Sequence, residues 1–222
     1  MPMIRVWGRK TSVNVQKVLW TLGELDIPFT RETVGGSFGG NRDADFLRMN
    51  PNGLIPVILD GDVTMFESNA IVRYLSARYR AGVLRPEEPH ALALAEQWME
   101  WQQTTFYPLV GTIFFQRVRL PENARDSQIL DKARGDMRNA IAIADRHLSQ
   151  HDWFAGEAFS FGDIVMGCLW WRYSGIGEEA GAAPHIAEWF EAVKDRHAFR
   201  EHVMVPRAAS PEDWTRIEKE VG

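Results

Sequence analysis

The order of strand-like and helix-like segments is the feature that most constrains the fold of this chain. Residues 3–7 are apolar and partly alternating, residues 13–25 carry apolar side chains at a helical spacing, and residues 27–34 are strand-like again. Two strands that are joined through a helix pair in parallel by a right-handed crossover. The first part of the chain therefore predicts a β-α-β unit.

A second unit follows a glycine-rich loop at residues 35–45. Residues 46–49 fit one helical turn, and residues 55–59 and 63–66 fit two strands of a hairpin, separated by the turn letters DGD. Residues 68–79 carry apolar side chains on one helical face. The second unit is therefore predicted to be β-β-α, which completes a small α/β domain.

From residue 91 onward the pattern predicts helices alone. Helical spacing covers residues 91–120, 124–149, 160–173 and 185–197, and no strand-like segment competes with them. Residues 82–90 contain glycine and prolines without any period, which is typical of a linker. We therefore expect an α/β domain at 1–81, a linker at 82–90 and an all-helical bundle domain at 91–222.

Composition excludes several classes of protein. The formal net charge is −5 over 222 residues, which argues against nucleic acid as a partner because phosphate binding needs a basic surface. No apolar run approaches a membrane span, and the first residues lack the pattern of a signal peptide. Cys168 is the single cysteine, so no internal disulfide or redox pair can form. We expect a cytoplasmic protein with no metal, because the six histidines show no metal-binding spacing.

One local signal in the helical half predicts structure rather than chemistry. Ser160 and Asp163 have the spacing of a capping box, in which the serine caps the helix and the acid reaches back to the serine backbone. We expect this pair to start a buried helix. A catalytic role for Asp163 is the weaker alternative.

Three positions in the first half could carry chemistry. Ser12 lies where a strand gives way to a helix, so it is either a helix cap or a hydroxyl donor to a ligand. Glu67 and Ser68 open another helix: either Ser68 caps that helix and Glu67 is simply exposed, or the helix start, with its free amides and partial positive charge, holds a carboxylate. An acid beside such a helix end suits the ammonium and carboxylate of an α-amino acid.

Pro56 opens a predicted strand and allows two interpretations. Taken alone, the sequence favours a trans peptide, since only about 5–6% of such bonds in folded proteins are cis. A cis peptide would turn the backbone of Ile55 outward, where it could pair with a peptide-like ligand as an added strand.

Four segments together resemble the cytosolic glutathione transferases, and in particular their bacterial serine-type, theta-like members. They are residues 8–20 (GRKTSVNVQKVLW), residues 50–58 (NPNGLIPVI), residues 66–75 (FESNAIVRYL) and the capping box at 159–163. The resemblance covers most of the chain, in order and with suitable spacing. It implies a thioredoxin-like, glutathione-binding first domain, an all-helical electrophile-binding domain, and a homodimeric enzyme of detoxification with Arg73 and Tyr74 as candidate subunit contacts.

The resemblance also implies roles for individual residues. Glutathione would be the co-substrate, with Ser12 donating a hydrogen bond to its sulfur and Asn14 sharing or replacing that role. Its cysteinyl part would pair with the Ile55 backbone beside a cis Pro56. Leu54 departs from the related pattern, which often has lysine there. The implied glutathione-binding residues are therefore Asn41, Arg42, Asn52, Ile55, Pro56, Glu67 and Ser68, of which the first three are candidates for the glycyl carboxylate.

The electrophile is expected against the helical half. Aromatic residues in the segment 91–120 suggest an apolar electrophile, although aromatic side chains at helical spacing more often belong to a core. The candidate pocket residues are Trp101, Thr105, Phe106 and Phe114. A glutathione-dependent disulfide reductase, peroxidase or dehalogenase, and a glutathione-binding module without catalysis, stay open as alternatives to a transferase.

Overall fold

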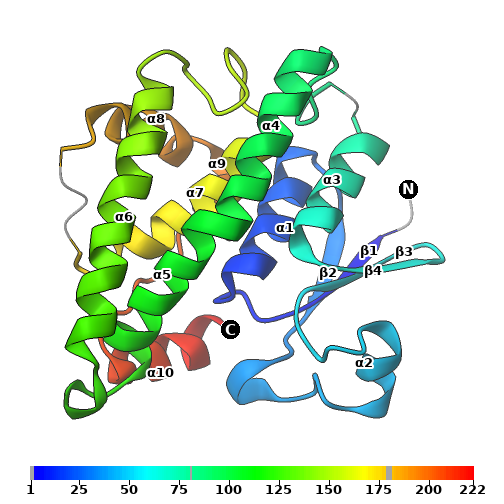
Figure 1. Ribbon diagram of the computed structural model, residues 1–222. Coiled ribbons are helices and arrows are strands. Elements are labelled where there is room, and N and C mark those ends of the chain that lie inside the picture. Colours follow the sequence, from blue (N-terminus) through cyan, green and yellow to red (C-terminus); the bar gives the residue numbers. More distant parts are fainter. Residues whose placement is uncertain (1–2, 81, 179–181) are drawn as a thin grey trace.

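The first half of the chain folds around a mixed sheet of four short strands. The computed structural model describes residues 3–80, 82–178 and 182–222 (Figure 1). The strands run in the order β2-β1-β3-β4, with β1 parallel to β2 and β3 antiparallel to both β1 and β4. Their bounds are β1 Ile4–Trp7, β2 Phe29–Glu32, β3 Val57–Asp60 and β4 Val63–Phe66. The predicted β-α-β and β-β-α order is confirmed.

The two faces of this sheet bury different residues. Side chains alternate along a strand, so Ile58 joins the large core under α1 (Val13–Glu24) and α3 (Ser68–Arg78). Its neighbour Val57 joins a small cluster on the opposite face with Trp7 and Phe46, and Phe46 lies in α2 (Ala44–Met49). The sheet is therefore covered on both faces.

The second half is helical, as predicted. The segment from residue 89 to residue 119 is one uninterrupted helical run that contains two π-helical stretches (Figure 1). A further four long helices and one short helix follow it. The bounds are α4 Pro89–Trp101, η2 Gln102–Phe106, α5 Tyr107–Phe114, η3 Phe115–Arg119, α6 Ser127–Leu148, α7 Phe161–Ser174, α8 Pro184–Lys194, α9 His197–His202 and α10 Pro211–Val221; two short 3-10 turns are η1 Gly36–Phe38 and η4 Glu122–Ala124.

Two of these helices were not expected from the sequence, namely α9 and α10. The signal for α10 is local: Ser210 accepts a hydrogen bond from the amide of Asp213 at 3.1 Å, and Pro211 occupies the first turn. A capping serine followed by proline and acidic residues is a typical helix start. The sequence pattern alone placed no element there.

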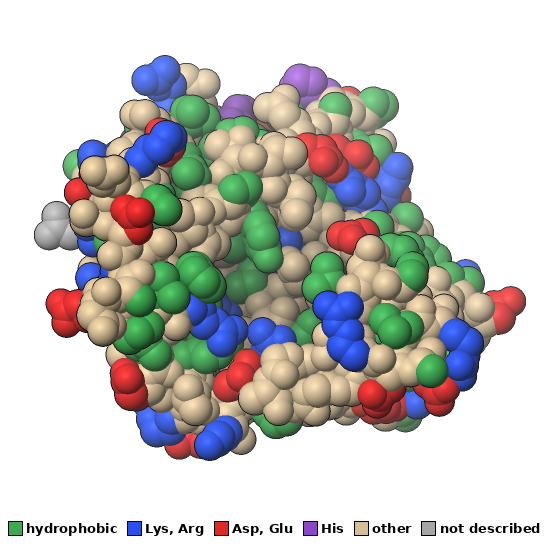
Figure 2. All heavy atoms as spheres, turned by 60° about the horizontal axis from the view of Figure 1, so that its bottom comes forward, with side chains coloured by type: hydrophobic (Ala, Val, Ile, Leu, Met, Phe, Trp, Pro, Cys, Tyr) green, Lys and Arg blue, Asp and Glu red, His purple; other side chains and the backbone are tan. Residues whose placement is uncertain are grey.

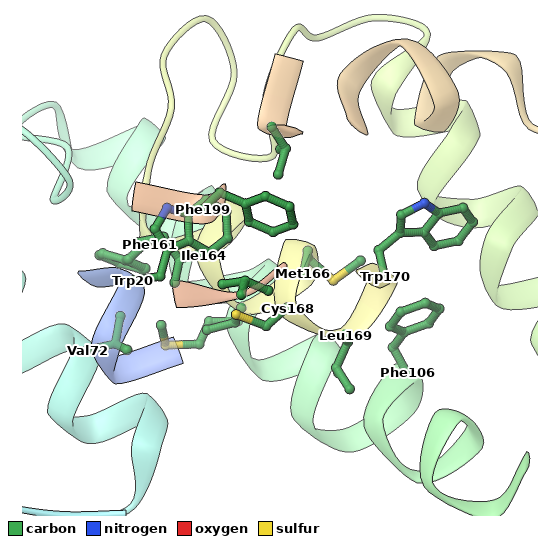
Figure 3. Packing of buried hydrophobic residues seen from close by; sticks show 14 of the residues in the cluster. Trp20, Val72, Phe106, Phe161, Ile164, Met166, Cys168, Leu169, Trp170 and Phe199 are labelled. Carbon is green, nitrogen blue, oxygen red and sulfur yellow. The ribbon is translucent and has the colours of Figure 1, made fainter. Parts of the chain in front are cut away.

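The capping box is confirmed at the start of α7. Asp163 accepts hydrogen bonds from the backbone amides of Ser160 at 2.9 Å and Phe154 at 3.0 Å, and from the indole of Trp189 at 3.0 Å. Burial raises the pKa of its carboxyl to about 6. The box starts a helix that runs through the centre of the core (Figure 3).

The two halves share one continuous core. Trp20 of α1 is fully buried, and its ring centroid lies 5.7 Å from that of Phe159 and 4.8 Å from that of Phe199 in α9. The helix α1 thus packs on α3 within its own half and on α7 and α9 of the other half. Between the halves, α3 ends at Arg78 and α4 begins at Pro89. In the described part of the chain, no helix combines the length and apolar character that crossing a bilayer needs.

Candidate active site

A cavity of about 160 Å³ opens at the start of α1, where the two halves meet. Figure 2 shows a hollow between the halves, with hydrophobic side chains on its walls and Lys or Arg side chains beside them. The first half contributes the loop before α1 and its first turn, and the second half contributes α5, η3, α7 and α10. The lining residues are Arg9, Thr11, Ser12, Val13, Asn14, Tyr107, Val110, Gly111, Phe114, Arg119, Leu169, Arg172 and Trp214.

Ser12 is the N-cap residue of α1, but its hydroxyl does not cap the helix. Its backbone is extended, with φ −80° and ψ 123°, and no hydrogen bond from a helix amide reaches its side chain. The side chain is half-buried and lines the cavity. The hydroxyl is therefore available to a ligand at the positive end of the α1 dipole.

Asn14 lies two residues further on and also lines the cavity. Its side-chain Oδ1 is buried and has no hydrogen-bond partner among the described residues. The hydroxyl of Thr11, which is buried beside it, is likewise without one in this part of the structure. Buried polar groups are usually paired, so the start of α1 holds an incomplete set of hydrogen bonds.

The Ile55–Pro56 peptide is cis, as the family resemblance implied and as the sequence alone did not. The backbone amide and carbonyl of Ile55 make no hydrogen bond to other described residues. Leu54 is 59% exposed next to them. An extended peptide can therefore approach this edge without displacing an existing pairing.

Glu67 and Ser68 lie at the start of α3. Glu67 is exposed and has a left-handed backbone, with φ 69° and ψ 105°, which is costly for a residue other than glycine. Ser68 is buried behind it, and the first helix amides receive no side-chain cap. Glu67 carries a negative charge, and the uncapped start of α3 carries a partial positive charge. Together they can bind the ammonium and the carboxylate of an amino acid.

The three candidates for the glycyl carboxylate differ in how strongly they are engaged. Asn41 donates to the carbonyl of Gly53 at 2.7 Å, and the side chain of Asn52 donates to Asn50 at 3.1 Å. Arg42 is exposed, and its hydrogen bond to the Asn52 carbonyl is 3.4 Å long. Arg42 is the one cation among the three candidates, and its hydrogen bond is the longest of the three.

Comparisons with known proteins decide the family. Residues 11–78 match the family model of the glutathione S-transferase N-terminal domain, and residues 103–196 match that of its C-terminal domain. Glutathione S-transferase GstB of Escherichia coli K12 is 39% identical over 206 residues, which cover 92% of this chain and 99% of the relative. The chain belongs to the glutathione S-transferase family.

Other relatives agree with this placement. Glutathione S-transferase 3 of Zea mays is 31% identical and is matched over 91% of this chain and 94% of its own length. A crystal structure of the theta class glutathione S-transferase of Xanthomonas axonopodis pv. citri, with glutathione bound, superimposes with a TM-score of 0.87 at 38% identity, covering 92% of this chain and 98% of that one.

Three of the four residues expected in the electrophile pocket of this transferase do not line the cavity. Phe114 does, whereas Phe106 is 1% exposed and stacks on Trp101, with ring centroids 5.8 Å apart. Phe106 also stacks on Trp170, with ring centroids 6.3 Å apart (Figure 3). Thr105 lies in the same π-helical stretch and is absent from the cavity wall. A regular period of 3.6 residues already places Trp101, Thr105 and Phe106 on other faces than Phe114, because residue type, rather than position on one helical face, selects these candidates. The cavity wall of α5 is Tyr107, Val110, Gly111 and Phe114.

The sequence analysis also missed charged residues at the site. Arg9 forms an ion pair with Glu218 of α10, with 2.7 Å between Nε and Oε1. Arg172 of α7 donates a hydrogen bond of 2.6 Å to the carbonyl of Thr11. Arg119 and Arg172 both line the cavity. These residues come from helices far apart in the sequence, and no short motif marks them.

Lys17 is a buried cation in α1. Its ammonium donates to Asn69 Oδ1 at 3.0 Å and to Gln102 Oε1 at 3.1 Å, so it joins α1 and α3 to the helical half. Burial lowers its pKa to about 8, and the nearby Cys168 and Glu67 partly oppose that shift. Among the described residues, no group of three His, Cys, Asp or Glu side chains is placed to hold a metal ion.

Proposed function

We propose that this glutathione transferase holds glutathione along the Ile55–Pro56 backbone that precedes β3 and directs its thiolate at an electrophilic carbon in the cavity. One observation supports this most: Ser12 and Asn14, at the start of α1, line the same cavity as the aromatic wall of the helical half. The sulfur would lie at the helix start, and the electrophile would lie against Val110, Phe114 and Trp214. These side chains suit the apolar body of a small molecule.

The γ-glutamyl part of glutathione is assigned to the start of α3. Its carboxylate would accept hydrogen bonds from Ser68 and the uncapped helix amides, and its ammonium would pair with Glu67. The support is the opposite chemistry of these neighbours, together with the exposed position of Glu67.

The remaining parts of glutathione lie along residues 41–56. The cysteinyl backbone would pair with the unpaired amide and carbonyl of Ile55, as in other β-strand additions. For the glycyl carboxylate we assign Arg42, because Asn41 and Asn52 already donate to other groups.

Activation of the thiol needs more than the helix dipole. A cysteine thiol titrates near pH ~8.5, and ionising most of it at neutral pH requires a drop of roughly two pKa units, or ~2.7 kcal/mol. A helix dipole contributes ~0.3–1 kcal/mol. A hydrogen bond to a charged acceptor contributes ~1.5–3 kcal/mol. A side-chain donor at Ser12 or Asn14 must therefore supply most of the shift.

Titration of the bound thiol tests this mechanism. The ultraviolet absorbance of the thiolate in the binary complex is followed against pH for the wild type, Ser12→Ala and Asn14→Ala. We expect the thiol pKa to rise by about one to two units in at least one variant. An unchanged thiol pKa in both variants, with glutathione still bound, would contradict the assignment.

Two further assays separate the alternatives. Calorimetric titration with glutathione measures binding, and a chloronitrobenzene assay measures transfer. Binding together with conjugate formation supports a transferase. Binding without turnover of any electrophile would favour a glutathione-binding module instead.

A homodimer is also part of this proposal, and family membership supports it. The two residues first expected at the subunit contact are engaged within the chain: Arg73 pairs with Glu96 and Glu100, and Tyr74 donates to Asp60 at 2.8 Å. Light scattering on the purified protein measures the number of chains.

A further inference from the structure

The cavity beside Ser12 carries an excess of positive charge. Three arginines line it, namely Arg9, Arg119 and Arg172, and the described lining residues include no carboxylate. An uncharged apolar molecule would leave the charges of these guanidinium groups without a counter-ion. The charges of these arginines must therefore be neutralised by other groups.

Arg9 is already neutralised within the chain. Its Nε lies 2.7 Å from Oε1 of Glu218, and both side chains are largely buried. This pair joins the loop before α1 to α10, and its role is explained by that contact.

Arg119 and Arg172 have no such partner. Neither forms an ion pair with a carboxylate in the described part of the chain, and Arg172 donates only to the backbone carbonyl of Thr11. Their guanidinium carbons lie 4.2 Å and 5.1 Å from the ring centroid of Trp214. The same two carbons lie 5.7 Å and 4.8 Å from the ring centroid of Phe114. The two cations are thus held by aromatic rings at one end of the cavity.

Holding two unpaired cations there is electrostatically costly. Burial, together with the charges of Arg119 and Arg9, lowers the pKa of Arg172 to about 10. Desolvation also lowers the pKa of Arg119, which is more exposed, and the charge of Glu218 partly opposes that shift. A bound anion would remove both the loss of solvation and the repulsion, and a guanidinium can hold a carboxylate through two parallel hydrogen bonds.

We propose that the electrophile of this transferase carries an anionic group, a carboxylate, which Arg119 and Arg172 hold while the reactive carbon faces Ser12. The inference rests on the proposed function and specifies its substrate class. The rings of Phe114 and Trp214 would contact the apolar body between the carboxylate and the reactive carbon. For an aryl halide, the glutathione sulfur forms a bond to the halogen-bearing carbon, the halide leaves with the bonding electron pair, and the thiol proton passes to solvent.

A pair of electrophiles of equal shape tests the charge. The substrates 4-chloro-3,5-dinitrobenzoate and 4-chloro-3,5-dinitrobenzamide differ by one negative charge, and each rate is divided by its uncatalysed rate with glutathione at the same pH. We expect the corrected kcat/KM of the wild type to be at least ten times higher for the benzoate. The unreactive 3,5-dinitrobenzoate should also compete with the electrophile at least ten times more strongly than 3,5-dinitrobenzamide.

Variants assign the preference to these residues. Arg119→Gln should reduce the benzoate-to-benzamide ratio to within about threefold of unity, and Arg119→Lys should keep part of it. Arg172→Gln is expected to act in the same direction. Arg146→Gln is the control, because it removes the same charge from an exposed position of α6 that does not line the cavity. Its ratio should equal that of the wild type.

The outcomes distinguish a failure of the anion site from a failure of the proposed transferase function. Equal corrected rates for the two substrates in the wild type would overturn the anion site and leave the transferase intact. Equal losses for both substrates in Arg119→Gln would also overturn it, since the arginines would then act on the thiolate. Glutathione binding with no turnover of either substrate would overturn the proposed function as well. The inhibitor pair gives the same decision on the wild type if a variant fails to fold.

Discussion

Lys17 shows how one buried side chain links the two halves of the molecule. It is 0% exposed, and its ammonium lies between acceptors on α3 and on the π-helical stretch η2. Its pKa is lowered to about 8 because burial disfavours the charged form. A charged lysine at this position costs stability, and the cost depends on pH.

The pH dependence has a definite sign. Between pH 8 and the ordinary lysine pKa, the unfolded chain keeps a proton that the folded chain has released, so stability rises with pH in that range. Relative to Lys17→Met, the free energy of unfolding of the wild type should increase by about 2 kcal/mol from pH 8 to pH 10. Urea unfolding at several pH values measures it.

A lysine on the surface provides the control for this experiment. Lys132 of α6 is exposed and pairs with Asp136 at 2.6 Å. Lys132→Met should differ from the wild type by less than ~0.5 kcal/mol across the range. If the difference in unfolding free energy between the wild type and Lys17→Met does not change with pH, then the pKa of Lys17 is not lowered in the folded chain.

At the scale of single residues, local signals predict where two of the candidate site residues lie. Ser12 and Glu67 each stand where a strand gives way to a helix, and their places follow from the chain alone. Arg119 and Arg172 could not be found in that way. Arg119 ends η3 and Arg172 lies in α7, so tertiary packing alone brings them to one cavity, and it leaves no short motif in the sequence.

At the scale of elements, α10 depends on one serine. Ser210 accepts a hydrogen bond from the Asp213 amide, and the helix supplies Trp214 to the cavity. Ser210→Ala should destabilise this helix by about 1 kcal/mol. Amide exchange in residues 211–221 should then accelerate about fivefold, because the open form becomes more populated.

Exchange elsewhere in the chain distinguishes a local effect from a global one. Thr215→Ala alters the same helix but removes only an exposed hydroxyl that donates to the Pro211 carbonyl at 2.9 Å. It should leave exchange in 211–221 unchanged or slower. If Ser210→Ala accelerates exchange equally in α6 and α7, then α10 does not open on its own.

The pattern of elements was also predictable to different degrees. The sheet and its helices follow from alternation and helical spacing, and the order β2-β1-β3-β4 agrees with the predicted units. The helix α9 has six residues, too few for a clear period, and α10 has a polar exposed face. Short or mostly solvated helices form here because neighbouring elements pack against them.

At the scale of the whole molecule, the shared core predicts a single unfolding event. Trp20 belongs to the first half but packs on Phe159 and Phe199 of the second. Trp20→Ala should lower the free energy of unfolding by ~3–5 kcal/mol. Helical circular dichroism and glutathione binding should be lost at the same urea concentration in the wild type and in the variant.

A surface aromatic residue is the matched control. Phe115 is 53% exposed, so Phe115→Ala should change stability by less than ~0.5 kcal/mol. Two separate transitions in the wild type, one for binding and one for helicity, would show that the halves unfold independently.

The π-helical stretches before and after α5 have a consequence for how this wall can change. A π-helical turn is an α-helical turn with one residue added, and each residue of an α-helix advances the chain by about 100° around the axis. Loss of a single codon within 102–106 can therefore be absorbed by a return to a regular α-helical turn, and the side chains of α5 would keep their direction relative to α4. Loss of a codon within α4 itself would instead turn Tyr107 and Phe114 by about 100° toward different neighbours. The two π-helical stretches thus mark the places where the length of this long helical run can change while the cavity wall stays intact.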